Sequence, residues 1–123
     1  METKKKILVI DDEPPYRELL KTILEKNNFI VFDVPDGQEA NIVLQSIDKI
    51  DLVITDLMMP GEHGIDVMIR IKKDYKVPVL VISGVYDKEM FEEEGIRFSD
   101  GFLKKPIETN ELLNIVAMLT QNE

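Results

Sequence analysis

Four short apolar runs in this sequence each end at polar residues that could share one reaction site. The first run ends at Asp11 and Asp12, and the second ends at Asp56. The third ends at the hydroxyl of Ser83, and the fourth at the ammonium of Lys105. If these runs are neighbouring parallel strands, their carboxyl ends meet at one edge of one sheet. The spacing therefore predicts three carboxylates, a hydroxyl and an ammonium in one place.

Three carboxylates this close together repel one another, at a cost on the order of 4 kcal/mol for each pair about 4 Å apart. A folded protein relieves such repulsion by protonation or with a cation. Mg²⁺ is the expected cation, with Mn²⁺ as an alternative, because Mg²⁺ prefers carboxylates and pairs with phosphate. A nearby lysine would complete a site for a phosphoryl group. A carboxylate can itself accept the phosphoryl group as an aspartyl phosphate.

The composition restricts the classes of function. The 123 residues, 44% of them hydrophobic, predict one domain over residues 1–123 with a real core. A net charge of −9 opposes nucleic acid and anionic membranes, and the stretch after Lys105 contains no Lys or Arg. No apolar run approaches the ~20 residues that cross a bilayer. We therefore expect a cytoplasmic chain that binds neither nucleic acid nor membrane.

Apolar strand-like runs alternate with helix-like stretches along the whole chain. The expected strands are 6–10, 29–34, 51–55, 78–82 and 99–103. The expected helices are 14–27, 36–46, 64–74, 86–94 and 108–121. Continuous apolar runs favour strands that are covered on both faces. The pattern predicts an α/β fold with a parallel sheet and right-handed crossovers.

Local signals support two helix starts. Pro14 and Pro15 suit a first helical turn, where backbone donors have no partner within the helix. Asp36, followed three residues later by Glu39, reads as a capping box. Both signals place a helix directly after a strand.

Four segments carry most of the predicted site: ILVIDDEP, DLVITDLMMPGEHG, VPVLVISG and GFLKKPI, in this order. Together they resemble a response regulator receiver domain, the phosphoacceptor module of two-component signalling that is also found in chemotaxis regulators. The resemblance covers nearly the whole chain. It implies a flavodoxin-like, doubly wound (βα)5 sandwich with a five-stranded parallel sheet of order 2-1-3-4-5 and helices on both faces.

The resemblance also implies a role for each residue at the acidic edge. Asp56 would be the phosphoacceptor. Asp12 would bind Mg²⁺ directly, and Asp11 would act mainly through water. The backbone carbonyl of Met58 would be a further metal ligand.

The remaining implied roles concern the signal. Ser83 would be the switch hydroxyl, Lys105 would pair with the phosphoryl group, and Phe102 would be the aromatic switch residue. The Lys105–Pro106 peptide would be cis. A sensor histidine kinase or phosphotransfer protein would donate the phosphoryl group, and a downstream protein or fused output domain would respond. We expect a monomer or a weak, phosphorylation-dependent dimer, because the last helix lacks basic residues for a salt-bridged dimer.

Other interpretations remain open at this point. The chain could be a receiver-like scaffold that works without phosphorylation. An aspartate-nucleophile phosphohydrolase would need a second aspartate two residues after the nucleophile, where this chain has Met58. A nucleotide or flavin module is disfavoured because the glycine-rich phosphate loops are missing. Glu13 could serve only as the acidic start of a helix, Phe102 could be plain core, and Lys104 and His63 are expected at the surface.

Overall fold

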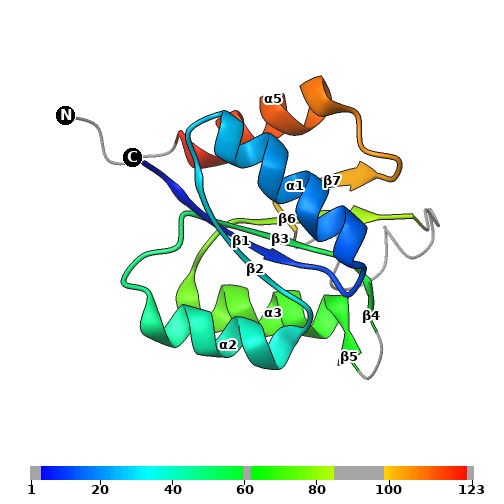
Figure 1. The fold of residues 1–123 in the computed structure, drawn as a ribbon. Coiled ribbons are helices and arrows are strands. Elements are labelled where there is room, and N and C mark those ends of the chain that lie inside the picture. The colour runs from blue at the N-terminus through cyan, green and yellow to red at the C-terminus, as the bar shows by residue number, and fades with distance from the viewer. Residues whose placement is uncertain (1–3, 60–61, 85–98, 122–123) are drawn as a thin grey trace.

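The computed structural model describes residues 4–59, 62–84 and 99–121, and its centre is a five-stranded parallel sheet (Figure 1). The strand order is β2-β1-β3-β6-β7. Counted along the five parallel strands, this is the predicted order 2-1-3-4-5. The strands are β1 Lys6–Ile10, β2 Ile30–Val34, β3 Leu52–Thr55, β6 Val79–Ser83 and β7 Gly101–Lys104.

Helices cover both faces of this sheet. They are α1 Pro14–Lys26, α2 Gly37–Ser46, α3 Gly64–Tyr75 and α5 Thr109–Thr120. Figure 1 shows α1 and α5 on one face and α2 and α3 on the other. The predicted α/β, flavodoxin-like sandwich is confirmed for this part of the chain. The helix predicted over 86–94 lies outside the described residues.

The core has two halves because successive residues of a strand point to opposite faces of the sheet. In β1, Ile7 and Val9 pack towards α1 and α5, whereas Leu8 and Ile10 pack towards α2 and α3. All four side chains are fully buried. The apolar runs are therefore continuous for the reason the sequence suggested: both faces of the sheet are covered.

The starts of α1 and α2 show the signals that the sequence indicated. Pro14 and Pro15 occupy the first positions of α1. The carboxylate of Asp36 caps α2 by accepting a hydrogen bond from the backbone N–H of Glu39 at 2.9 Å. These caps fix where the chain leaves the ends of β1 and β2, and so fix the neighbouring acidic residues.

The fifth strand and the last helix approach each other closely at Gly101. A Cβ atom at this position would lie 2.6 Å from Cδ1 of Ile115 and 3.2 Å from Cδ1 of Leu80. A side chain at this position would therefore require the end of the Ile115 side chain to move. This packing carries β7 against β6 and brings the segment after β7 to the carboxyl edge of the sheet.

Two features differ from the sequence predictions. A short antiparallel hairpin, β4 Met58–Met59 with β5 Glu62–His63, follows β3 where a loop was expected. The fifth strand begins at Gly101 rather than at residue 99. Its predecessor, Asp100, turns its carboxylate to the N–H of Val79 at 2.8 Å and to Lys72. That carboxylate accepts the N–H of Val79 at the start of β6, and regular strand pairing begins at Gly101, two residues after the predicted start.

Among the described residues, no helix is both long enough and apolar enough to cross a bilayer.

Candidate functional site

Asp11 and Asp56 are held in place by backbone hydrogen bonds that continue the sheet. The N–H of Asp11 donates to the carbonyl of Val34 at 3.1 Å, and the N–H of Asp56 donates to the carbonyl of Ile10 at 3.1 Å. Asp11 therefore extends β1 along β2, and Asp56 extends β3 along β1. The two carboxylates lie side by side at the carboxyl edge of the sheet, as the sequence predicted.

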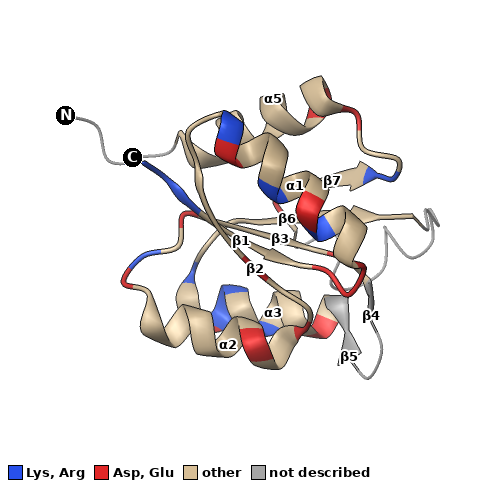
Figure 2. Ribbon diagram, viewed as in Figure 1, with Lys and Arg blue, Asp and Glu red and all other residues tan. Residues whose placement is uncertain are grey.

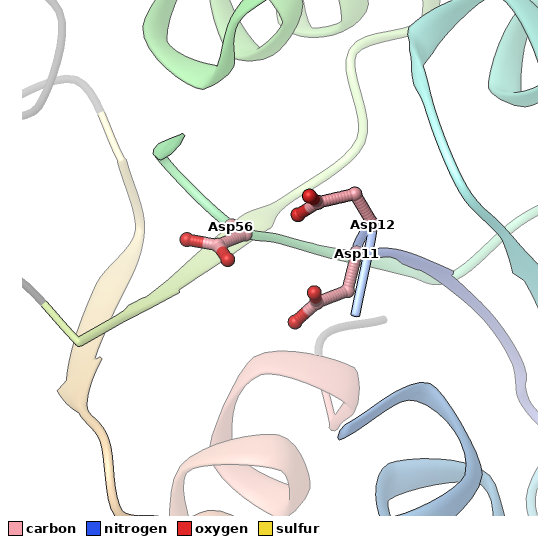
Figure 3. Close-up of side chains that lie close together, drawn as sticks. All are labelled: Asp11, Asp12 and Asp56. Atoms are coloured by element: carbon pink, nitrogen blue, oxygen red, sulfur yellow. The ribbon is translucent and has the colours of Figure 1, made fainter. Parts of the chain in front are cut away.

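Three carboxylates gather at this edge. One oxygen each of Asp11, Asp12 and Asp56 lies within 4.8 Å of the others. In Figure 3 the carboxyl groups of Asp11 and Asp12, at the end of β1, extend towards the side on which Asp56 lies. Asp11 and Asp56 are only 3% and 5% exposed. Water can therefore do little to screen the repulsion between them.

Lys105 supplies the balancing charge. Its Nζ lies 3.2 Å from Asp11 Oδ2, 3.1 Å from Asp56 Oδ2 and 2.7 Å from Glu13 Oε1. The same Nζ lies 4.0 Å from the centre of the Tyr16 ring. The lysine side chain is only 8% exposed. One buried ammonium thus holds together groups from three elements of the chain.

Burial and charge shift the protonation of this cluster. Burial raises the pKa of Asp11, since a charged carboxylate loses its hydration there; the N–H of Glu13 and the ammonium of Lys105 oppose that rise. For Lys105, burial alone would lower the pKa. The carboxylates of Glu13, Asp11 and Asp56 outweigh it, so the pKa of Lys105 lies above its ordinary value of 10.5.

A cleft of about 490 Å³ opens above these charges. Its lining combines the charged cluster with the end of β6 and the segment after β7: Asp12, Glu13, Tyr16, Asp56, Ser83, Gly84, Lys105 and Pro106. Ser83 is buried, and its carbonyl accepts a hydrogen bond from the N–H of Lys105 at 2.8 Å. The Lys105–Pro106 peptide is cis, as predicted. Four of the five predicted polar residues therefore line the cleft: Asp12, Asp56, Ser83 and Lys105. The fifth, Asp11, contacts Lys105.

The other predicted residues lie near the cleft without lining it. The backbone of Met58 lies in β4, directly after the segment that carries Asp56. Phe102 lies in β7 and is half-buried, and it packs against the core between the sheet and helices α2 and α3. Lys104 is exposed, as expected.

Sequence reasoning missed two residues that contact Lys105. Glu13 does precede α1 as its N-cap residue, but its side chain makes no capping hydrogen bond and turns to Lys105 instead. Tyr16 contributes its ring from the first turn of α1. The available signal was position: residues three or four apart on a helix share a face. The start of α1 thus presents Glu13 and Tyr16 to the same cleft.

Arg17 is a third residue that the sequence did not single out. Its Nη1 donates to the carbonyl of Asp11 at 2.8 Å, and its Nε lies 3.4 Å from Asp33 Oδ2. The guanidinium therefore ties α1 to β2 and fixes the backbone that carries the acidic pair.

The donor set fits a hard divalent cation. All three side chains offer oxygen, which Mg²⁺ prefers. Both oxygens of Asp11 already accept hydrogen bonds, from the N–H of Glu13 at 2.9 Å and from Lys105. Oδ1 of Asp12 is buried and has no hydrogen-bond partner among the described residues. A buried carboxylate oxygen without a partner is costly, and a metal ion is one way to satisfy it.

Comparisons with known proteins agree with this geometry. The family model of the response regulator receiver domain matches residues 7–117. The chain is similar to response regulator TrrA of Thermotoga maritima, solved in complex with Mg²⁺ and BeF, with 32% identity, 94% of this chain and 98% of that chain covered, and a TM-score of 0.84. A Francisella receiver domain shows 30% identity over 96% of this chain and 98% of that chain, with a TM-score of 0.85. Chemotaxis regulator CheY4 of Vibrio cholerae shows 26% identity over 95% and 99%, with a TM-score of 0.85.

Proposed function

Because this chain belongs to the response regulator receiver domains of two-component signalling, we propose that it is a phosphorylation-dependent switch that accepts a phosphoryl group on Asp56. The observation that carries the proposal is the position of this carboxylate. Asp56 is buried to 5% exposure at the base of an open cleft, 3.1 Å from the ammonium of Lys105 and beside two further carboxylates. A nucleophile, a cation and a metal-ligand set therefore converge on one point.

Mg²⁺ is the metal we assign to this cleft. Asp12 would bind it directly through its unpartnered oxygen, whereas Asp11, whose oxygens are both engaged, would act through water. Asp56 and the backbone carbonyl of Met58 complete the proposed protein ligands. When bound, Mg²⁺ would neutralise charge on the carboxylates and on the phosphoryl oxygens. Mn²⁺ remains a prediction.

The proposed reaction is a displacement at phosphorus. An oxygen of the Asp56 carboxylate forms the new O–P bond with its own electron pair. The P–N bond to a phosphohistidine breaks, and its electron pair returns to the imidazole nitrogen of the donor. Lys105 remains beside Asp56 and places a positive charge where the phosphoryl oxygens arrive. The reaction changes the chain itself, as expected of a signalling domain rather than of an enzyme that turns over a substrate.

The signal would leave the cleft through β6 and β7. Ser83 lines the cleft, and Lys105 and Phe102 belong to the neighbouring segment. A shift of Ser83 towards the new oxygens would favour a second position of Phe102, which is how a local charge change biases two states. The donor would be a sensor histidine kinase or phosphotransfer protein that meets this chain in the cytoplasm. A downstream protein or a fused output domain would bind the altered surface, with the chain a monomer or weak dimer.

Incubation with acetyl phosphate and Mg²⁺, followed by intact-mass measurement, tests the function. We expect the wild type to gain one phosphoryl group and Asp56→Asn to gain none. Asp51→Asn, the same change at the opposite edge of the sheet, is the matched control and should label like the wild type. Labelling of Asp56→Asn to the wild-type extent, or no labelling of wild type at any Mg²⁺ concentration, would refute the proposal.

A further inference from the structure

Lys105 has two kinds of partner at this site. Asp11 and Asp56 belong to the set of three carboxylates whose oxygens lie within 4.8 Å of one another, the set proposed to hold Mg²⁺. Glu13 is not part of this set, yet its Oε1 makes the shortest of the three contacts to Nζ, at 2.7 Å against 3.1 and 3.2 Å. The lysine is thus shared between the metal ligands and a carboxylate outside them.

A divalent cation would affect the partners of Lys105 differently. Its charge would compete with the ammonium for Asp11 and Asp56 and would repel the ammonium directly. The carboxylate of Glu13 is not one of the proposed metal ligands. It can therefore keep its contact with Lys105 when the metal binds. The Tyr16 ring, 4.0 Å from Nζ, adds a second contact that does not depend on the aspartates.

We propose that Glu13 is the positioning residue that keeps Lys105 in the cleft once Mg²⁺ engages the aspartates. This inference rests on the proposed function, because it assumes a Mg²⁺ site at Asp11, Asp12 and Asp56. Without Glu13, Asp11 and Asp56 would be the remaining carboxylates in contact with the ammonium, and a metal ion would have to compete with Lys105 for both of them. Loss of Glu13 therefore weakens Mg²⁺ binding, although it removes no metal ligand.

Titration calorimetry of Mg²⁺ into the metal-free protein tests this directly, without any phosphorylation. We expect Glu13→Gln to weaken Mg²⁺ binding about three- to tenfold, the scale of one charge-assisted hydrogen bond that is partly exposed to solvent. Glu18→Gln removes the same charge from an exposed position of α1 and should leave the affinity within about twofold, as expected for a screened surface charge. Glu13→Asp, which keeps the charge on a shorter arm, should restore part of the affinity.

The Lys105→Met background separates an effect through the lysine from an effect of charge alone. If Glu13 acts by holding Lys105, Glu13→Gln in that background changes Mg²⁺ affinity by less than about half as much, on a logarithmic scale, as in the wild type. An equal effect in both backgrounds, or tighter binding by Glu13→Gln, would overturn the inference. If the wild type binds no Mg²⁺, the proposed function fails instead, so the two failures remain distinct.

Discussion

The two ends of the central sheet carry the same kinds of charged side chain in different surroundings. At the carboxyl end, the side chain of Lys105 is 8% exposed and touches the side chains of Asp11 and Asp56, which are 4% and 5% exposed. At the amino end, Lys49 is 77% exposed and lies 3.6 Å from Asp51. Figure 2 shows acidic segments directly after β1 at one end and basic segments at the beginning of β1 at the other.

The amino end is also hollowed. A cleft of about 340 Å³ is lined there by Lys5, Lys49 and Lys76 together with Asp51 and several apolar residues. The carboxylate of Asp51 is already satisfied, because Oδ2 accepts the N–H of Lys6 at 2.8 Å and Oδ1 faces Lys49. A hollow with charged walls is therefore not enough for chemistry. At the carboxyl end the charged side chains are buried. Water cannot stabilise them there, so they depend on an opposite charge nearby.

Replacement of each lysine by methionine should show the largest difference between the two ends. Lys105→Met leaves buried carboxylates without their cation, and we expect the metal-free protein to lose about 3 kcal/mol of unfolding free energy. Lys49→Met removes an exposed cation and should change that free energy by no more than about 0.5 kcal/mol. Urea unfolding in the presence of a chelator measures both.

A Mg²⁺ titration of the same unfolding reaction extends this comparison. Mg²⁺ should stabilise Lys105→Met more than it stabilises the wild type, since the metal then replaces the positive charge that the buried carboxylates have lost. Equal losses of stability in the two lysine variants would contradict the role given to burial.

Replacement of one aspartate at each end should give the next largest difference, now in metal binding. Asp12→Asn removes the carboxylate with the unpartnered oxygen, and Mg²⁺ affinity should fall at least about tenfold, a loss typical of residues that support a metal site. Asp51→Asn should leave Mg²⁺ affinity unchanged, because Asp51 lies at the opposite edge. Calorimetry at pH 7 distinguishes the two. A similar loss in both variants would mean that overall charge, not the site, governs binding.

The sequence predicted most of the carboxyl edge because its residues end apolar runs. The order of the runs predicted that Asp56 and Lys105 lie at one edge of the sheet, since parallel strands align their ends. The order of the strands, and the pairing of Lys105 with the acidic site, came from the resemblance to receiver domains. Glu13 escaped this reasoning. Its contact with Lys105 spans 92 positions and depends on the angle at which α1 leaves β1. Acidic residues are common at helix starts, and this preference explained the presence of Glu13. It gave no indication of the contact with Lys105.

The β4–β5 hairpin could not be predicted for a related reason. Each of its strands has two residues, Met58–Met59 and Glu62–His63. Periodicity needs four or more residues before alternation becomes visible. The start of β7 was misplaced because a side chain, Asp100, replaces a backbone partner of Val79. A side chain that takes the place of a backbone hydrogen-bond partner does not change the hydrophobic periodicity, so the sequence gives no sign of it.

The smallest expected difference concerns pH. Since the pKa of Lys105 in the folded chain lies above 10.5, its ordinary value, the folded state holds this proton more tightly than the unfolded state. The stabilisation by Lys105 is therefore complete below pH 10.5 and is lost as pH rises through the folded pKa. The gap in unfolding free energy between the wild type and Lys105→Met should stay constant from pH 8 to 10 and shrink above 10.5, measured by urea unfolding in chelator. Lys49→Met, whose gap from the wild type is already expected to be no more than about 0.5 kcal/mol, serves as the control. A constant gap up to pH 12 would mean that the ammonium gains nothing from the carboxylates around it.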